Sequence, residues 1–391
     1  FKLSEIDLET GEETILLNAD EDVKDSAYSA DGRYVFFTSN AYSDFIELMR
    51  YDRETGELIP VLSDVGYDID DIAVSPDRSR MAVSYNRDGL SMIVVIDMNR
   101  LTLIAGPAER SPGVVGSMRF SPDGEMLAIS VSQPEVPWRS GLYDYRTGAF
   151  EPWTGGFKPN QKMTSLVPDL TTYKTFDMDG DAPRRIPLLA YRPSTASAEN
   201  PAPVVIFAHG GPESQSRPSF SRFYHYIVTQ MGIAVLRPNI RGSDGYGKTF
   251  EQLDETTRRA DAIRDIGALL DWIEEQPDLE THGMKHADRH RLFHRAAQPA
   301  QGVVEAEVVD IVPPRRDAGA DHGDDADMAD GLVKEPSTGG GDDQQGDDLK
   351  TKGVADAVCG AAHGVVPVLV GSSRVAAQMG EVVLAWGQYG D

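Results

Sequence analysis

Short apolar runs alternate with polar turns along the first 155 residues of the chain. Three turns that begin with serine start at Ser29, Ser75 and Ser121, so that they lie 46 residues apart each time. Each turn contains Asp with Pro or Gly, residues that favour tight turns, and therefore predicts a β-hairpin. The apolar runs that follow these turns are residues 34–37, 81–83 and 126–129.

A second turn marker recurs in phase with the first. An apolar or aromatic residue followed by Asp, and mostly by Thr-Gly, marks it at Asp7, Asp52, Asp97 and Asp144. A unit of roughly 46 residues with about four short strands has the size of one β-propeller blade. The repeats predict about three blades, whereas closed propellers need at least about four, so we expect further blades before Phe1. A β-sandwich with chance similarity among its turns is the alternative.

The pattern changes between residues 156 and 280, where apolar runs of strand length alternate with helical spacing. Two of the predicted strands flank an Asp-Gly turn, and the other two are wholly apolar, which is typical of strands buried on both faces. Such alternation predicts an α/β sheet whose ligand site lies at the carboxyl ends of the strands. The predicted strands are 172–176, 186–191, 204–208 and 233–236, and the predicted helices are 220–230 and 249–276.

Residues 281–391 form a third stretch with a different composition. Of the 31 aromatic residues of the chain, only Phe293, Trp386 and Tyr389 fall in it, whereas six of the eight histidines do. Its 111 residues include 16 Gly, 16 Ala and 15 Val, with acidic runs between them. This composition supplies little for a core and predicts poor order, above all across residues 313–353.

The charge of the chain excludes several classes of function. It carries 63 acidic and 37 basic residues, a net charge of −26, so we expect no nucleic-acid partner.

No run of 18 apolar residues occurs, so we expect no membrane span. Cys359 is the only cysteine, which excludes internal disulfides and Cys-x-x-Cys sites. Together with the lack of a visible leader it predicts a cytoplasmic protein, and an export signal before Phe1 would make it periplasmic or secreted.

Two motifs in the α/β part resemble a known family. They are His209-Gly210-Gly211-Pro212 with Gln215, and Arg237-Pro238-Asn239-Ile240-Arg241-Gly242-Ser243 with Gly245-Tyr246-Gly247. They are similar to the prolyl oligopeptidase family of serine peptidases, above all to its acylaminoacyl-peptidase and dipeptidyl-peptidase-like branch. The resemblance covers roughly residues 1–280 and includes Asp265 and Asp271 in the last predicted helix. With the repeats it implies a partial β-propeller (residues 1–155) and then a partial α/β-hydrolase domain (156–280). Residues 281–391 lie beyond the resemblance, and their composition predicts poor order.

The resemblance also implies roles for the motif residues. Gly210 and Gly211 would form the oxyanion-side loop, with Gly211 favoured as the N–H donor, because glycine lets the backbone approach the substrate closely. An ordinary strand-ending turn is the alternative interpretation. The remaining motif residues are predicted to be structural: His209, Pro212, Arg241, Gly242, Ser243, Gly245, Tyr246 and Gly247. Ser243 is not predicted to be a nucleophile, since Arg241 stands where a Gly-x-Ser-x-Gly elbow has its first glycine.

The catalytic triad of the family is not identifiable in this chain. The family places its serine elbow within roughly 20 residues of the helix that ends near Trp272, but the resemblance stops at Glu280, and no Gly-x-Ser-x-Gly follows. Ser373 follows a strand-like run, yet no histidine comes after it to act as base. Ser337 precedes Asp356 and His363 but has no strand in front of it.

Histidines recur at every fourth position after residue 281, at His282, His286, His290 and His294. This spacing would place them on one helical face, where zinc could bind. Neighbouring arginines would repel a dication, so we interpret the spacing as a feature of composition and expect no metal and no cofactor. Our hypothesis is that the reading frame or gene model changes near codon 281; translation of the other frames tests it.

The sequence therefore predicts a serine-type peptidase by resemblance, which hydrolyses short peptides through an acyl-enzyme. Because no nucleophile is identifiable, the chain as written is predicted to be inactive. Two rivals remain open: a catalytically dead remnant that acts as a binding module, and an esterase on the same α/β-hydrolase fold. A short peptide is the expected partner, and the oligomeric state and the preference for aminoacyl, dipeptidyl or prolyl substrates stay open.

Overall fold

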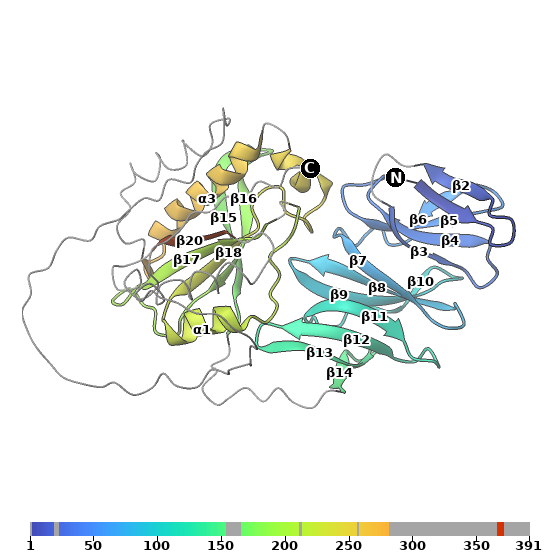
Figure 1. The fold of residues 1–391 in the computed structure, drawn as a ribbon, viewed down its shortest axis with the longest axis horizontal. Helices are drawn as coiled ribbons and strands as arrows, with labels where there is room; N and C mark the ends of the chain where they lie inside the picture. The colour runs from blue at the N-terminus through green and yellow to red at the C-terminus, as the bar shows by residue number, and fades with distance from the viewer. Residues whose placement is uncertain are drawn as a thin grey trace, which may run out of the picture.

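The computed structural model describes residues 2–18, 23–153, 166–210, 213–255 and 258–280, and the backbone of residues 366–370. Figure 1 shows a row of small antiparallel sheets beside one larger sheet with helices on both sides. The boundary predicted at residue 155 and most of the stretch 281–391 lie outside the described residues. Among the described helices, none has the length and apolar character needed to cross a bilayer.

The N-terminal part contains three four-stranded antiparallel sheets within the described residues, each with its strands in chain order. A two-stranded sheet, β1 (Lys2–Ile6) with β2 (Glu13–Asn18), precedes them. The predicted apolar runs fall on the second strand of each sheet. The sheets are β3 (Val23–Tyr28), β4 (Tyr34–Ser39), β5 (Glu47–Asp52) and β6 (Leu58–Pro60); β7 (Ile69–Val74), β8 (Arg80–Arg87), β9 (Leu90–Asp97) and β10 (Thr102–Ala105); and β11 (Val114–Phe120), β12 (Leu127–Gln133), β13 (Val136–Asp144) and β14 (Ala149–Pro152).

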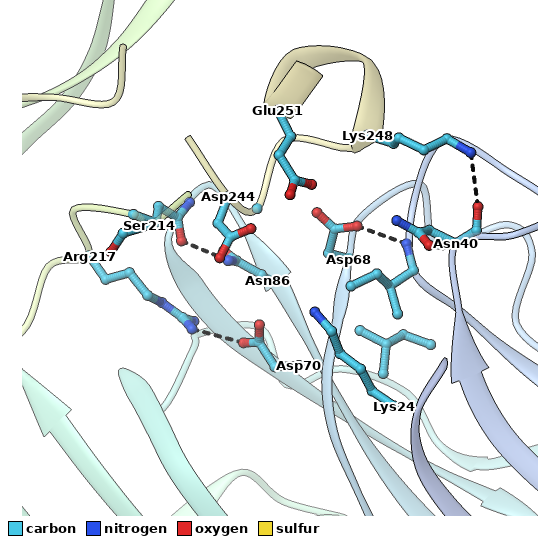
Figure 2. Close-up of a pocket in the computed structure, with 14 residues that line it drawn as sticks. Lys24, Asn40, Asp68, Asp70, Asn86, Ser214, Arg217, Asp244, Lys248 and Glu251 are labelled. Atoms are coloured by element: carbon cyan, nitrogen blue, oxygen red, sulfur yellow. Dashed lines mark hydrogen bonds and ion pairs between the residues drawn. The ribbon is translucent and has the colours of Figure 1, made fainter. Parts of the chain in front are cut away.

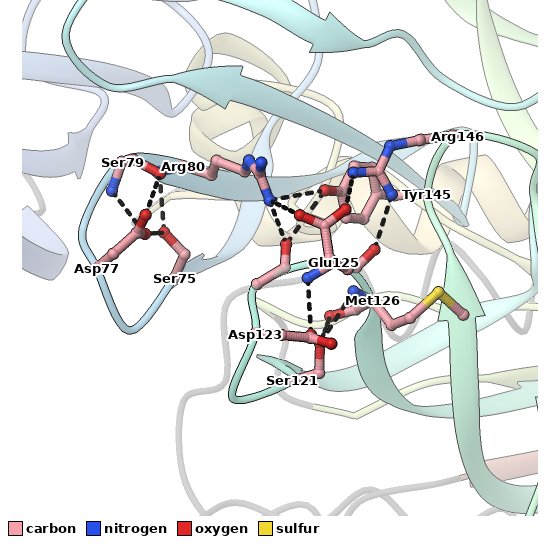
Figure 3. Close-up of polar contacts among 11 residues, drawn as sticks. Ser75, Asp77, Ser79, Arg80, Ser121, Asp123, Glu125, Met126, Tyr145 and Arg146 are labelled. Atoms are coloured by element: carbon pink, nitrogen blue, oxygen red, sulfur yellow. Dashed lines mark hydrogen bonds and ion pairs between the residues drawn. The ribbon is translucent and has the colours of Figure 1, made fainter.

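The repeated serine turns have the same hydrogen bonds in all three sheets. The hydroxyls of Ser29, Ser75 and Ser121 each donate to the Asp two residues later at 2.6 Å. Each hydroxyl also accepts from the backbone N–H five residues later, at 2.9, 2.9 and 3.0 Å. Figure 3 shows the second and third of these turns, linked by Arg80. The 46-residue period is therefore one turn structure built three times.

The middle sheet, β7 to β10, is buried on both faces. Met81 and Val83 on one face join a core with Phe36 and Leu48 of the preceding sheet. Alternate residues of the same strands point to the other face, where Ala82 joins a core with Leu127 and Ile129 of the following sheet. Strand β7 lies beside both β3 and β11. Sheets that stack face to face with their first strands adjacent are arranged as propeller blades.

The larger sheet has the order β15-β16-β18-β17-β19, and β20 also pairs with β17. Strands β15 (Asp169–Asp179) and β16 (Ala182–Tyr191) form a hairpin, and β18 (Ala234–Pro238) runs antiparallel to β16. Strand β17 (Ala202–Ala208) is parallel to β18 and to β19 (Leu279–Glu280), and antiparallel to β20 (Val366–Val370). This mixed sheet is the α/β element that the apolar pattern predicts.

Helices cover the two faces of this sheet (Figure 1). Helix α1 (Arg222–Gln230) buries Ile227 and Val228 against one face, with Val205 and Val235. Helix α3 (Arg259–Glu274) buries Leu269 and Ile273 against the opposite face. The alternation of residues along β17 explains this division, because neighbouring side chains of a strand point to opposite faces.

The prediction of one helix over residues 249–276 is wrong. The segment consists of α2 (Lys248–Glu251), the 3₁₀ turn η1 (Gln252–Asp254) and α3. Glu255 is extended, with ψ of 142°, and ends the first turn. Asp254 is buried, and its carboxylate lies where a β-carbon on Gly242 would be, 2.3 Å from the Asp254 Cγ. Packing of the turn against the loop after β18 thus overrides the helical spacing.

Candidate functional site

The two sequence motifs come together at one edge of the α/β sheet. His209 and Gly210 follow β17 directly, and Asn239 to Gly247 form the loop between β18 and α2. Because β17 and β18 are parallel, their carboxyl ends meet at the same edge, where α/β sheets bind ligands. Gly211 and Pro212 lie outside the described residues, so the favoured oxyanion donor stays a prediction.

His209 is hydrogen-bonded to the second motif. Its Nε2 lies 2.8 Å from the Ser243 hydroxyl oxygen, and that hydroxyl donates to the Ile240 carbonyl at 2.5 Å. With its own proton used in that way, Ser243 accepts, so His209 carries its proton on Nε2. Burial lowers the pKa of His209 and favours the neutral ring, although the Gly210 carbonyl oxygen beside Nδ1 acts in the opposite direction. His209 thus fastens the loop after β17 to the loop after β18.

Ser243 and His209 have the spacing of a catalytic pair but lack its chemistry. Ser243 is 0% exposed, so substrate has no access to its hydroxyl. The histidine donates to the serine, whereas a general base must accept the serine proton. His209 Nδ1 lies 3.3 Å from the Gly210 carbonyl oxygen, the place where a triad has its carboxylate. Ser243 has the contacts of a buried structural residue.

Arg241 anchors the loop after β18 to helix α3. Its guanidinium is 3% exposed and donates to both carboxylate oxygens of Asp265, at 2.9 and 2.8 Å, and Asp265 is 0% exposed. Asp177 of β15 accepts from the same guanidinium at 2.9 Å. The Phe176 ring lies 4.5 Å from the guanidinium carbon, at cation–π distance. A buried charge is retained because it is paired on all sides.

Asn239 is a structural residue that sequence reasoning did not single out. It is fully buried, accepts from the Ser216 N–H at 2.7 Å and donates to the Ser216 carbonyl at 3.1 Å. The same amide donates to the Tyr246 hydroxyl at 2.7 Å. The Asn239 amide pairs with the backbone of Ser216 as a neighbouring strand would, and so joins the loop after β17 to the loop after β18. In the sequence, its position inside the Arg237–Ser243 motif is the one signal that indicates this role.

A cavity of about 310 Å³ lies between the propeller sheets and the two loops that follow β17 and β18. Figure 2 shows its polar side chains, which come from both parts of the chain. Asp68 accepts from the Ile46 N–H and from the Gly247 N–H, at 2.8 and 3.2 Å, and burial raises its pKa. The charged lining residues are Asp68, Asp70, Asp244 and Glu251 on the acidic side and Lys24, Arg217 and Lys248 on the basic side.

Arg217 joins the cavity wall to the propeller. Its guanidinium donates to the Asp70 carboxylate, the Gly89 carbonyl and the Ser91 hydroxyl, all at 2.9 Å. Burial raises the pKa of Asp70, and Arg217 opposes that rise. Arg217 and Asp70 are fixed relative to each other, because three acceptors bind the one planar guanidinium of Arg217.

The described strands on the far side of β17, away from β18, run in two directions. Strand β19 pairs with Ala202 and Pro203 in the parallel direction, and β20 pairs with Val204 to Ala208 in the antiparallel direction. Val370 therefore lies opposite Val204, and β20 ends at the sheet edge remote from His209. A strand that delivers a nucleophile beside Gly210 must run parallel to β17 and end at its carboxyl end. Ser337 and Ser373, and the histidines of residues 282–294, lie outside the described residues.

Within the described ranges, no cluster of His, Cys, Asp or Glu has the geometry of a metal site.

Comparison with known proteins supports the motif interpretation. The profile of the Prolyl oligopeptidase family matches residues 218–284. Dipeptidyl aminopeptidase BIII of Pseudoxanthomonas mexicana is 24% identical over 238 residues, which cover 56% of this chain and 32% of that protein. The uncharacterized peptidase YuxL of Bacillus subtilis (strain 168) is 28% identical over 141 residues, 35% of this chain and 20% of that protein.

Solved structures show the same fold. The crystal structure of puromycin hydrolase superposes with a TM-score of 0.59 at 19% identity, over 69% of this chain and 41% of that one. Pyrococcus horikoshii acylaminoacyl peptidase superposes with a TM-score of 0.51 at 18% identity, over 70% and 41% of the two chains.

The predicted resemblance to the prolyl oligopeptidase family is therefore confirmed, and so is the fold, a partial β-propeller followed by an α/β-hydrolase domain. The chain spans a third or less of the length of the curated relatives that it matches.

Proposed function

We propose that this chain, which resembles the prolyl oligopeptidase family, carries the oxyanion-side half of a serine-peptidase site, binds short peptides there and does not hydrolyse them as it stands. One observation carries the proposal. The loop that begins with His209 and Gly210 lies at the carboxyl end of β17, beside the interdomain cavity. On the side of β17 away from β18, the described strand next to residues 204–208 is the antiparallel β20.

The chemistry of acyl transfer explains why half a site is insufficient. Negative charge develops on the substrate carbonyl oxygen, and one backbone N–H aimed at it contributes about 3–4 kcal/mol of barrier lowering. The Gly210-Gly211 sequence supports such a role, because glycine leaves its N–H accessible. The covalent step also requires a serine activated by a histidine, and Ser243 with His209 does not meet that need.

The charges of the cavity favour a peptide with a free amino terminus. Asp244 is exposed and projects from the loop after β18 toward the interior in Figure 2, and Asp68 and Glu251 line the same space. Carboxylates in a partly closed space attract an ammonium group more strongly than they would in bulk water. The relative from Pseudoxanthomonas mexicana, a dipeptidyl aminopeptidase by name, supports the same class of ligand.

Labelling with a fluorophosphonate probe tests the proposed lack of hydrolysis. The purified 391-residue chain should remain unlabelled under conditions in which dipeptidyl aminopeptidase BIII is labelled completely. Covalent labelling would overturn the proposal of inactivity. Turnover of dipeptidyl amides against simple esters would then decide between a peptidase and an esterase.

Calorimetric titration with a dipeptide amide tests the proposed binding. We expect binding that weakens roughly tenfold when the peptide amino group is acetylated, and also in Asp244→Asn, since about 1.4 kcal/mol of ion pairing is lost. Glu54→Gln, a neutralised carboxylate remote from the cavity, is the matched control. Equal affinity for the free and acetylated peptides would contradict the ammonium site, and no binding of either would contradict the binding function.

A further inference from the structure

We propose that the loop of residues 241–247 couples the propeller to the oxyanion-side loop, so that the docked propeller sets the position of His209 and Gly210. The inference deepens the proposed function and rests on it only for the role of Gly210. Asp44 and Arg217 are the positioning residues. Two separate sets of contacts support it, one at each end of the segment of residues 209–217.

The first set of contacts starts at Asp44, in the propeller loop between β4 and β5. Its carboxylate accepts from the Thr249 N–H and the Thr249 hydroxyl, at 2.7 and 2.6 Å, and its carbonyl accepts from the Lys248 N–H at 2.7 Å. Asp68, also in the propeller, accepts from the Gly247 N–H. The first residues of α2, and the end of the loop before them, are thus fixed by the propeller.

Two motif glycines make this docking sterically feasible. A β-carbon on Gly247 would lie 2.6 Å from the Asp44 carboxylate, and one on Gly245 would lie 2.6 Å from the Asn86 amide nitrogen. Both contacts are with propeller side chains, and both glycines have φ of +84°. The sequence explains these glycines by loop conformation alone. The structure adds a second reason, the close approach of the propeller to the loop.

The loop itself transmits a displacement as one unit. Arg241 is held by Asp265, and Asn239 by Tyr246, so the start and the end of the loop are tied to buried groups. Ser243 stands between these anchors and is hydrogen-bonded to His209 at 2.8 Å. A shift of the loop therefore moves the partner of the His209 ring, one residue before Gly210.

The second set of contacts joins the propeller to the other end of the segment of residues 209–217. Asn86 of the propeller donates to the side-chain oxygen Oε1 of Gln215 at 2.7 Å, and Arg217 donates to Asp70, Gly89 and Ser91. The segment of residues 209–217 is thus attached to the propeller at its end directly and at its start through the loop. Neither attachment uses a residue that is expected to touch a reacting bond.

The His209 ring reports on this coupling without any need for activity. We would label the 391-residue chain with ¹⁵N-histidine, assign His209 with the variant His209→Gln and record ring nitrogen shifts across pH. The charged groups that face the ring are Arg237 of β18 and Asp244 of the loop, which act on its pKa in opposite directions. In the wild type we expect one neutral tautomer with the proton on Nε2.

Asp44→Ala and Arg217→Met test the two sets of contacts separately. Each should move the His209 ring shifts toward a mixture of tautomers, raise its pKa toward the ordinary value, and speed amide exchange in residues 205–210 by roughly tenfold. Asp44→Asn, which keeps one oxygen for the Thr249 N–H, should restore the wild-type ring shifts in large part. Asp97→Ala is the matched control, since the Asp97 carboxylate likewise accepts two hydrogen bonds, here from two backbone N–H groups of a propeller turn, but is remote from the loop.

Wild-type His209 shifts and exchange in both variants would overturn the coupling. Exchange of β8 and of α3 at wild-type rates verifies that each variant is folded. A variant that fails this check is replaced by Asn86→Ala, which removes the bond to Gln215 and also the bond that the Asn86 side-chain oxygen accepts from the Gly89 N–H. Covalent labelling by a fluorophosphonate, or loss of peptide binding, would overturn the proposed function and leave these His209 results unchanged. The two proposals therefore fail independently.

Discussion

The propeller sheets and the α/β sheet are held together in different ways. In the propeller, each serine turn closes on itself, and the same two hydrogen bonds recur at Ser29, Ser75 and Ser121. In the α/β part, one buried ion pair between Arg241 and Asp265 joins segments that are 24 residues apart. The first region repeats short-range contacts, whereas the second depends on single long-range ones.

This difference determines how damage spreads. A defect in one propeller turn removes local hydrogen bonds and leaves the equivalent turns intact. A defect in the Arg241 cluster frees the loop after β18, helix α3 and strand β15 at once, because all three contribute to it. We therefore expect large, shared effects in the α/β sheet and small, separate effects in the propeller.

Asp265→Ala should give the largest effect. It leaves the Arg241 guanidinium buried with Asp177 as its remaining close partner, and loss of one member of a buried pair costs about 3–5 kcal/mol. Urea unfolding followed by hydrogen exchange of α3 and β17 measures the loss. Exchange should accelerate in both elements together, with little change in β8 and β9.

Arg264→Ala is the control for this variant. Arg264 is half exposed on the same helix and pairs with Asp261, so its loss should cost less than about 1 kcal/mol. Equal costs for the two variants would show that the buried pair has no special weight. An Asp265→Ala effect that spread into the propeller would show that the two regions unfold as one.

Ser29→Ala, Ser75→Ala and Ser121→Ala should each have a smaller and local effect. Each variant removes one donated and one accepted hydrogen bond that the three turns share, with an expected cost of about 1–2 kcal/mol. Ser121→Ala also removes a longer contact of the hydroxyl, 3.2 Å, with the Met126 carbonyl. Hydrogen exchange should accelerate only in the hairpin that carries the substitution. Three similar values would support the equivalence of the repeats, and acceleration across all three sheets would contradict their independence.

The repeats explain why the propeller was predictable from sequence. Each turn is specified by residues within five positions of one another, so the 46-residue spacing and the strands after Ser29, Ser75 and Ser121 could be predicted without knowledge of tertiary contacts. The helix predicted over residues 249–276 fails for the opposite reason. Its break depends on Asp254 packing against Gly242, a contact that no local pattern contains.

The candidate site shows the same limit. The motifs identified His209, Arg241 and Ser243 through resemblance, but their partners come from elsewhere in the fold. The direction of the His209–Ser243 hydrogen bond follows from the Ile240 carbonyl, which the sequence does not single out. Likewise, the docking role of Gly245 and Gly247 depends on side chains about 160 and 200 residues away, which contribute to the loop only in three dimensions.

Gly32→Ala and Arg78→Ala compare one turn position in two propeller sheets and should give the smallest effects. Gly32 has φ of +72° with no atom within 4 Å of an added β-carbon, so its substitution isolates the strain of a left-handed backbone, about 1 kcal/mol. Arg78 already has φ of 55° at the equivalent position, so Arg78→Ala adds no strain and removes only its hydrogen bond to the Tyr28 carbonyl, at a cost below about 0.5 kcal/mol. Thermal unfolding of the two variants measures both costs. If Arg78→Ala cost as much as Gly32→Ala, the side chain of Arg78 would carry the second turn, and the repeats would be equivalent in backbone but not in energy.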